Sequence, residues 1–337
     1  MAVATSLETT MTNATLSLKN RLLLCSQPNT LKCSLKCVLT STLMFACLFA
    51  SNVMAKSVGL VVTGIGGNEE YAENFREQGL SIVKALRSVG DDDQDFVLLS
   101  DEAATRDAVL DQLQAFAKID SQWFYLVLIG HGTIDSETWR FNLPGDDIAT
   151  DDLVAALADI RSPEQVVLVG TSASGAVLDI LSQPGRHVVT ATKSGGELNV
   201  VRFPEFFAQA MATTAADTDR NEILTLAEAY RFSNEKTQDY YTEKKLLASE
   251  HARLEGDKPD RVALARLGSL KSAKDDPAVA QLLEKRLVLE DEFLALKARK
   301  PSMDTALFYE ELEPLLVDIA RLQQEIDSVT GWVDTNE

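Results

Sequence analysis

The chain has 337 residues, of which 45 % are hydrophobic and 25 % charged, a composition typical of a folded protein with a sizeable core. Acidic residues outnumber basic ones by 51 to 32, which gives a formal net charge of −19. This charge excludes general nucleic-acid binding, which needs a basic surface, and disfavours docking on an anionic membrane face. Because only three histidines are present, a metal site built from several histidines is not expected.

The first 55 residues have the features of a secretory signal. Basic residues precede an apolar run at 38–50, and the small residues Val53 and Ala55 follow it. This order predicts cleavage after Ala55 and export of the chain, to a periplasm or as a secreted protein, with membrane anchoring by this segment as the alternative. All four cysteines lie within the first 47 residues. The mature chain is therefore expected to have no disulfide, no thiol nucleophile and no membrane span.

From Lys56 onward, short apolar runs alternate with helical patterns. The runs predict strands at 58–64, 95–99, 123–129, 165–169 and 187–192. The helical patterns cover 68–89, the segment after Asp101, 150–160 and 173–181. Such alternation with short connections predicts an α/β fold with a doubly wound, mostly parallel sheet covered on both faces. Ligands bind beyond the carboxyl ends of the strands in such sheets, so functional residues are expected there.

The rest of the chain is predicted to be mostly helical, with helices at 203–214 and 225–254 and a break at Lys300-Pro301. Beyond the break, apolar residues spaced alternately by three and four predict the seam of a helical hairpin or coiled coil, through which copies of the chain can self-associate. These residues are Leu312, Leu315, Ile319, Leu322, Ile326 and Val329.

The patterns divide the chain into four segments. They are a leader at 1–55, an α/β domain at 56–215, a loop and helix at 216–260, and a helical extension at 261–337.

Two glycine-flanked turns follow the third and fourth predicted strands. The first is Gly-His-Gly at 130–132, and the second is Gly-Thr-Ser-Ala-Ser-Gly at 170–175. Because consecutive strands usually neighbour in space, both turns are expected at the same edge of the sheet. His131 would then serve as a general base, the Gly132 N–H as an oxyanion donor, and a hydroxyl of Ser172 or Ser174 as a nucleophile. The alternative is structural: a tight turn at His131 and a helix N-cap at Ser172.

With these turns, the 56–192 region resembles the peptidase domain of the legumain-like family, relatives of the caspases. That family has its catalytic histidine in a His-Gly turn after the third strand, matched here by His131 and Gly132. Its catalytic cysteine lies in an Ala-Cys-Glu-Ser-Gly-like turn after the fourth strand, where this chain has Ser172. The stretch 71–78 is similar to the family's first helix, and the resemblance implies that Asn68 orients the histidine. It also implies a caspase-like fold and a peptide or protein as substrate or partner.

The serine at the position of the catalytic cysteine leaves two functions open. A hydroxyl is far less acidic than a thiol and needs a tuned base to become a nucleophile. One hypothesis is a legumain-like hydrolase of peptide bonds, with Ser172 as the attacking group and His131 as the base. The alternative is a catalytically inactive pseudo-peptidase that acts as a calcium-dependent protein-binding module. Neither function needs an organic cofactor.

The twelve residues 217–228 match the pattern of an EF-hand calcium loop. Oxygen ligands fall at positions 1, 3, 5, 7, 9 and 12 of the pattern, which are Asp217, Asp219, Asn221, Ile223 (through its carbonyl), Thr225 and Glu228. The departure is Glu222, which stands where the sharp turn calls for glycine. A left-handed backbone at a non-glycine residue costs about 1 kcal/mol or more, so weak Ca²⁺ binding is expected. The alternative is an acidic turn that caps a helix.

If the leader is a cleaved signal, intact-mass spectrometry of the mature protein will place its N-terminus at Lys56, because Val53 and Ala55 frame the cleavage point. A mature protein that retains any of the four leader cysteines would contradict this prediction.

Overall fold

The computed structural model describes residues 56–331 except for residues 91, 136 and 137. The predicted leader at 1–55 lies outside these residues, so its signal function stays a prediction. The described residues belong to one compact unit. Within the described part of the chain, no helix is both long enough and apolar enough to cross a membrane.

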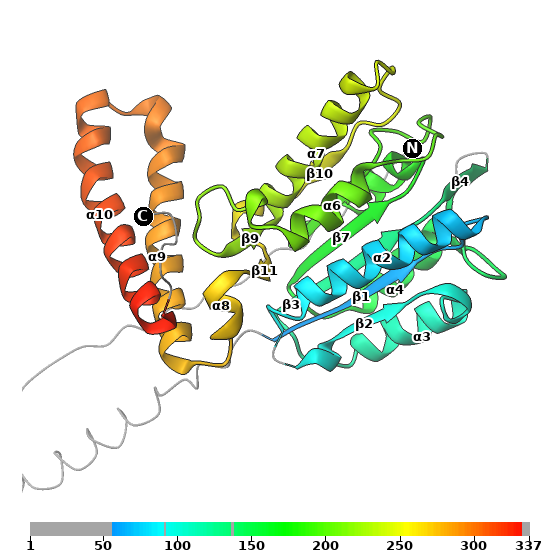
Figure 1. The fold of residues 1–337 in the computed structure, drawn as a ribbon, viewed down its shortest axis with the longest axis horizontal. Coiled ribbons are helices and arrows are strands. Elements are labelled where there is room, and N and C mark those ends of the chain that lie inside the picture. Colours follow the sequence, from blue (N-terminus) through cyan, green and yellow to red (C-terminus); the bar gives the residue numbers. More distant parts are fainter. Residues whose placement is uncertain (1–55, 91, 136–137, 332–337) are drawn as a thin grey trace, which may run out of the picture. The chain divides into compact units, whose positions relative to one another are not determined.

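The centre of the fold is a six-stranded sheet with the strand order β10-β8-β7-β3-β1-β2 (Figure 1). Five strands run parallel, as predicted: β1 (Ser57–Thr63), β2 (Phe96–Leu99), β3 (Trp123–Ile129), β7 (Glu164–Gly170) and β8 (Arg186–Thr190). The edge strand β10 (Arg253–Glu255) is antiparallel to β8. The helix predicted at 225–254 included the first residues of this strand. This prediction was wrong, because α7 (Leu226–Glu243) ends early and the chain returns to pair with the sheet.

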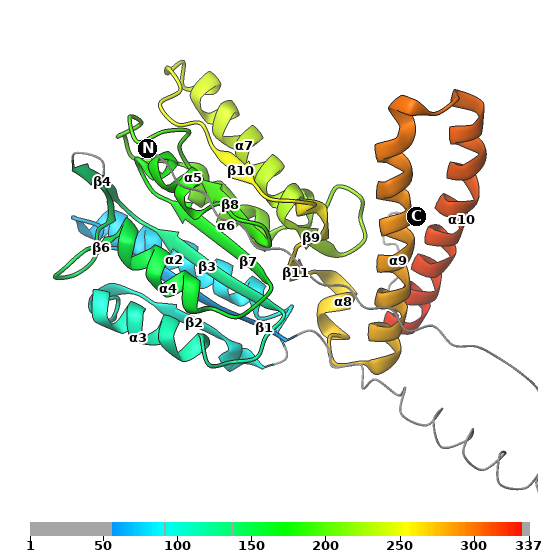
Figure 2. The same ribbon diagram turned by 180° about the vertical axis from the view of Figure 1, so that it is seen from behind.

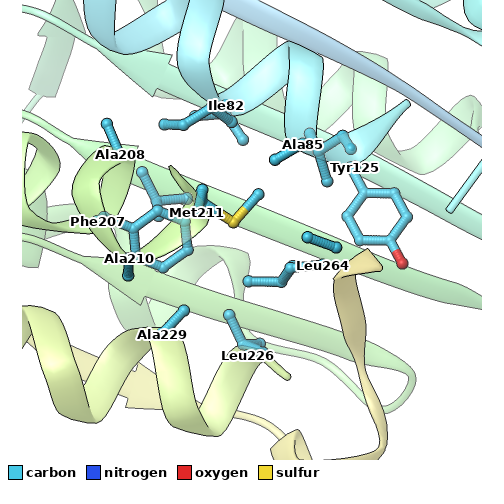
Figure 3. Packing of buried hydrophobic residues seen from close by; sticks show 14 of the residues in the cluster. Ile82, Ala85, Tyr125, Phe207, Ala208, Ala210, Met211, Leu226, Ala229 and Leu264 are labelled. Atoms are coloured by element: carbon cyan, nitrogen blue, oxygen red, sulfur yellow. The ribbon is translucent and has the colours of Figure 1, made fainter. Parts of the chain in front are cut away.

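Helices cover both faces of the sheet, which confirms the predicted α/β architecture (Figures 1 and 2). On one face lie α2 (Glu69–Leu86), α6 (Phe203–Ala212) and α7, and on the other α3 (Arg106–Phe116) and α4 (Thr150–Asp159). The side chains of β3 alternate between the two cores, since successive residues of a strand point to opposite faces. Figure 3 shows the first core, to which β3 contributes Tyr125, α2 contributes Ile82 and Ala85, and α6 contributes Met211.

A small antiparallel sheet that the sequence analysis did not predict follows β3. It consists of β4 (Gly132–Asp135), β5 (Thr138–Phe141) and β6 (Ile148–Ala149). Trp139 and Phe141 of β5 are fully buried in the second core, so this sheet is anchored to the central one. It begins directly after His131 and therefore fixes the turn that carries this residue.

The helix predicted at 173–181 is also corrected by the structure. A 3₁₀ turn (Ser174–Val177) leads into the single-turn helix α5 (Leu178–Leu181), and Ala173 has a left-handed backbone with φ of +56°. The other 3₁₀ turns of the described residues are Asp93–Asp95, Asp101–Ala103, Thr214–Ala216, Pro259–Arg261 and Lys300–Ser302.

The C-terminal extension is a helical hairpin. After the short helix α8 (Gly268–Ser272), α9 (Pro277–Arg299) and α10 (Thr305–Thr330) are joined at the predicted break. In the predicted seam, Leu322 and Ile326 are buried, but Val329 is 45 % exposed, so the seam ends at Ile326.

The 216–260 segment predicted as separate does not have a core of its own. Ala216, Leu224 and Leu226 belong to the first core of the sheet. In addition, β9 (Ile223–Thr225) pairs with β11 (Ala263–Arg266), a strand from the predicted extension.

Candidate functional site

Strands β3 and β7 bring the two predicted catalytic turns together. The strands are adjacent and parallel, and Ile129 pairs with Gly170 in their register. His131 lies two residues after Ile129, and Ser172 lies two residues after Gly170. Both turns therefore emerge at the same carboxyl edge of the sheet, as the strand order predicted.

The hydroxyl of Ser172 is bound by the backbone of Gly132. It donates to the Gly132 carbonyl at 2.8 Å and accepts from the Gly132 N–H at 3.3 Å. Ser172 is also buried, with a relative exposure of 5 %. The predicted nucleophile and the predicted oxyanion donor thus satisfy each other.

The residue at position 132 has to be glycine because the two turns approach so closely. A Cβ atom there would lie 2.4 Å from the Ser172 carbonyl oxygen, 2.5 Å from Thr171 Oγ1 and 2.7 Å from Trp139 Nε1. The Trp139 indole also donates to the Ser172 carbonyl at 3.4 Å. No larger side chain fits between these groups without shifting the backbone.

His131 is half-buried and makes contacts that are separate from Ser172. Its Nε2 lies 3.2 Å from the Gly66 carbonyl oxygen, and the rings of Tyr71 and Phe75 approach it edge-on at 5.3 and 5.2 Å. Since a carbonyl only accepts, Nε2 is the donor in this hydrogen bond. Among the described residues, no hydrogen bond joins His131 to Ser172.

Asn68 has a different role from the one that the resemblance implied. It is the N-cap of α2, and its side chain accepts from the Tyr71 N–H at 3.0 Å. The contact that orients His131 comes instead from a backbone carbonyl, that of Gly66. Sequence patterns carry little signal for such a contact, since it does not depend on a side chain.

Ser174, the other candidate hydroxyl, links the β7 turn to the loop after β8. It is fully buried, lies 3.2 Å from Thr192 Oγ1 and accepts from the Thr192 N–H at 3.1 Å. The same loop holds the residue after Ser172, because the Ala173 N–H donates to the Glu197 carbonyl at 2.8 Å. These contacts are structural.

The Glu197 side chain forms a polar cluster near these turns that the sequence analysis missed. Its carboxylate accepts from the Lys193 N–H at 2.9 Å and lies 2.5 Å from His251 Nδ1. Although burial opposes ionisation, these hydrogen bonds lower the pKa of Glu197. Because Glu197 and His251 are 54 residues apart, no local motif signals this pair.

The predicted calcium loop brings three carboxylates together. Single oxygens of Asp217, Asp219 and Glu228 lie within 4.8 Å of one another. Asn221 adds an amide beside them, since its Nδ2 donates to Asp219 Oδ2 at 2.9 Å. Oxygen donors of this kind fit Ca²⁺.

Two other predicted ligands are engaged in the loop's own structure. The Thr225 hydroxyl forms a capping box with Glu228 at the start of α7. The Ile223 N–H donates to Asn221 Oδ1 at 2.7 Å, and the Ile223 carbonyl lies in β9.

Glu222 has the strained backbone that the loop pattern requires. Its φ is +62°, the left-handed region that favours glycine. Its carboxylate accepts from the Ser269 N–H at 3.1 Å, the Ser269 hydroxyl at 2.6 Å and the Leu270 N–H at 2.9 Å. The side chain thus anchors α8 to the loop, and these charge-assisted hydrogen bonds offset the backbone strain.

Crowding of the acids changes their protonation. The pKa of Asp219 is raised to about 7. The largest cause is the partial burial of the Asp219 carboxylate, and the negative charges of Glu228 and Asp217 add to it. Burial also raises the pKa of Asp217. A bound divalent cation would remove this repulsion.

Comparison with known proteins gives matches at the level of structure only. No protein-family model matches the sequence, and no curated protein matches it. Among solved structures 75 chains match, including the caspases drICE and Dronc. The drICE crystal structure has a TM-score of 0.38 and 10 % identity, over 60 % of this chain and 87 % of that one. The Drosophila initiator caspase Dronc has a TM-score of 0.40 and 13 % identity, over 63 % and 82 %. Likenesses of this size carry no conclusion about activity.

The raised pKa of Asp219 predicts a pH dependence of stability. An acid whose pKa is higher in the folded than in the unfolded chain binds more protons when folded, so the free energy of unfolding falls as the pH rises. In the absence of divalent cations, the wild type should lose stability between about pH 4 and pH 7. Chemical denaturation across this range should show a smaller loss for Asp219→Asn, and a loss like the wild type's for Asp239→Asn, an exposed aspartate of α7. Parallel curves for all three proteins would contradict the prediction.

Proposed function

We propose that this chain is a peptidase-like protein that does not hydrolyse peptide bonds and acts by binding protein partners. The observation that carries the proposal is the double hydrogen bond between the Ser172 hydroxyl and the Gly132 backbone. It occupies both groups on which a serine mechanism at this edge of the sheet would depend.

Each catalytic requirement is opposed by a specific contact. A nucleophilic serine gives its proton to a base, but the Ser172 hydroxyl donates to the Gly132 carbonyl, which does not take up a proton at neutral pH. The oxyanion donor must point at the substrate, but the Gly132 N–H points at Ser172. The histidine Nε2 donates to Gly66, which leaves Nδ1 as the basic nitrogen, and among the described residues no hydrogen bond joins it to Ser172. Hydrolysis would require both hydrogen bonds between Ser172 and Gly132 to break.

The second candidate is the serine-dependent, legumain-like hydrolase. What favours it is the placement of a histidine and a serine two residues beyond paired ends of adjacent parallel strands. The two functions differ in whether His131 changes the reactivity of the group at position 172.

The thiol variant Ser172→Cys tests the proposal. For a protein without a catalytic pair, iodoacetamide should modify the introduced thiol more slowly than a free thiol near neutral pH, because burial disfavours the thiolate. The additional change His131→Ala should leave the rate unchanged. Mass spectrometry of the peptide that contains position 172 separates this signal from the leader cysteines, and Ser328→Cys, on an exposed part of α10, provides the accessible-thiol control.

Modification of the thiol at position 172 that is faster than the control and slowed by His131→Ala would overturn the proposal. It would show that the histidine lowers the pKa of the thiol, as in a catalytic pair.

We further propose that the 217–228 loop binds Ca²⁺ weakly, in the range of about 0.1–1 mM that is typical of extracellular modules. The three convergent carboxylates support this proposal. The buried guanidinium of Arg286 supports weak rather than tight binding, since it donates to the Asn221 carbonyl beside them at 3.3 Å. Export of the chain, which the leader predicts, would suit a site of this affinity.

At about 10 mM Ca²⁺, such a site should raise the free energy of unfolding by about 1–3 kcal/mol through mass action. Calorimetry should show a calcium-dependent rise in melting temperature for the wild type and for Asp239→Asn. The rise should be lost in Asp219→Asn and absent when Mg²⁺ replaces Ca²⁺ at the same concentration. An equal rise in Asp219→Asn would exclude the loop as the binding site.

A further inference from the structure

A cavity of about 260 Å³ lies at the amino ends of three neighbouring strands, at the opposite edge of the sheet from the candidate site. Its walls include Trp123, the first residue of β3, Glu164, the first residue of β7, and His187, the second residue of β8. The rest of the wall consists of Gly185 and the loop residues Asp257, Lys258 and Arg261. Because pockets for drug-sized ligands have about 300–1,000 Å³, this cavity suits a smaller molecule.

The three strand residues of the cavity face the same side of the sheet. Side chains alternate along a strand, and the residues two positions further on, Tyr125, Val166 and Val189, all belong to the first core. Trp123 also packs against this core, and its ring stacks on the His187 imidazole with the centroids 6.3 Å apart. The cavity therefore has an aromatic wall.

His187 has an unsatisfied nitrogen beside this cavity. The residue is buried, with 3 % exposure. Its Nε2 lies 2.6 Å from the Asp257 carbonyl oxygen, which only accepts, so Nε2 is the donor. In a neutral imidazole Nδ1 is then an acceptor, and it has no hydrogen-bond partner among the described residues. Because buried polar atoms are normally satisfied, this nitrogen indicates a place for the donor group of a ligand.

Three charged side chains of the cavity are unpaired. Within the described part of the chain, no hydrogen bond or ion pair engages the carboxylates of Glu164 and Asp257 or the ammonium group of Lys258. Arg261, in contrast, forms an ion pair with Glu290 at 3.2 Å. The unpaired groups therefore offer two negative charges and one positive charge to a ligand.

We propose that this cavity binds a free basic amino acid such as arginine. A ligand complementary to the unpaired groups has two cationic groups and one anionic group, which are the guanidinium, the α-ammonium and the α-carboxylate of arginine. The carboxylate would pair with Lys258, and the cationic groups with Glu164 and Asp257. A planar guanidinium also stacks on an indole, which Trp123 provides, and an ammonium group can donate to His187 Nδ1. An arginine within a peptide lacks both α charges and fits less well.

Isothermal titration calorimetry of the full chain, in reducing and calcium-free buffer near neutral pH, tests the proposal. L-Arginine should bind one-to-one with a Kd of about 1 mM or lower. Agmatine lacks the carboxylate, L-citrulline lacks the charge of the guanidinium, and Nα-acetyl-L-arginine amide, which represents arginine within a peptide, lacks both α charges. Each of these three should bind at least about tenfold more weakly than L-arginine, because each loses an ion-paired hydrogen bond.

Variants identify the groups that bind. Glu164→Gln should weaken L-arginine binding by about tenfold, whereas the matched control Glu235→Gln, at an exposed position of α7, should leave it unchanged. Lys258→Met should weaken L-arginine binding to a similar extent but leave agmatine binding unchanged, since agmatine has no carboxylate. A merely structural role of Lys258 would change both affinities alike. Because Lys258 is exposed, this variant tests the site even if Glu164→Gln does not fold.

Absence of L-arginine binding at up to about 10 mM would overturn the proposal, because the cavity would then hold only water. Equal affinity for L-citrulline would also overturn it, as would unchanged L-arginine binding in the folded variants at 164 and 258. Binding of the acetylated amide as tight as that of L-arginine would contradict a free amino acid as the ligand and assign the cavity to an arginine side chain of a peptide.

Discussion

The arrangement of the candidate site depends on the close approach of the turns that follow β3 and β7. The parallel register of the two strands places the turns beside each other, and the absence of a side chain at Gly132 allows them to approach closely. At this distance the Ser172 hydroxyl satisfies both polar groups of the Gly132 backbone. Since unsatisfied buried polar groups are costly, the contact is stable, and it directs the Ser172 hydroxyl at the Gly132 backbone. Ser172 thus links the turn after β7 to the turn after β3.

Hydrogen bonds of Glu222 join the 217–228 loop to the C-terminal helices and offset the strain of its left-handed backbone. Glu222 takes the left-handed backbone that the loop needs, and its carboxylate caps α8. The hydroxyl of Ser269, which donates to Glu222, also approaches Thr330 at the end of α10 at 3.0 Å. Arg286 of α9 reaches the loop from the other helix of the hairpin. The departure from the calcium-loop pattern therefore serves to attach the hairpin, and the loop and hairpin belong to one structural unit.

The sequence was informative where the physics is local. Apolar runs predicted all five parallel strands, and Lys300-Pro301 marked the hairpin turn. Prediction failed where distant segments decide the structure: β10 forms because β8 offers an edge, and β4–β6 depend on the burial of Trp139 and Phe141. At the candidate site, the positions of His131 and Ser172 followed from strand order. Their hydrogen-bond partners did not, because Gly66 and Gly132 act through backbone atoms that no side-chain pattern reveals.

We infer that Ser172 is a structural residue and not a nucleophile. Treatment of the wild-type protein with a fluorophosphonate probe, followed by mass spectrometry of the peptide that contains position 172, tests it most directly. The structure predicts no adduct on Ser172 under conditions in which an active serine hydrolase is labelled completely, because the hydroxyl is buried and its proton is directed at a carbonyl. An adduct on Ser172 that disappears in His131→Ala would contradict the claim and establish the protein as a serine hydrolase.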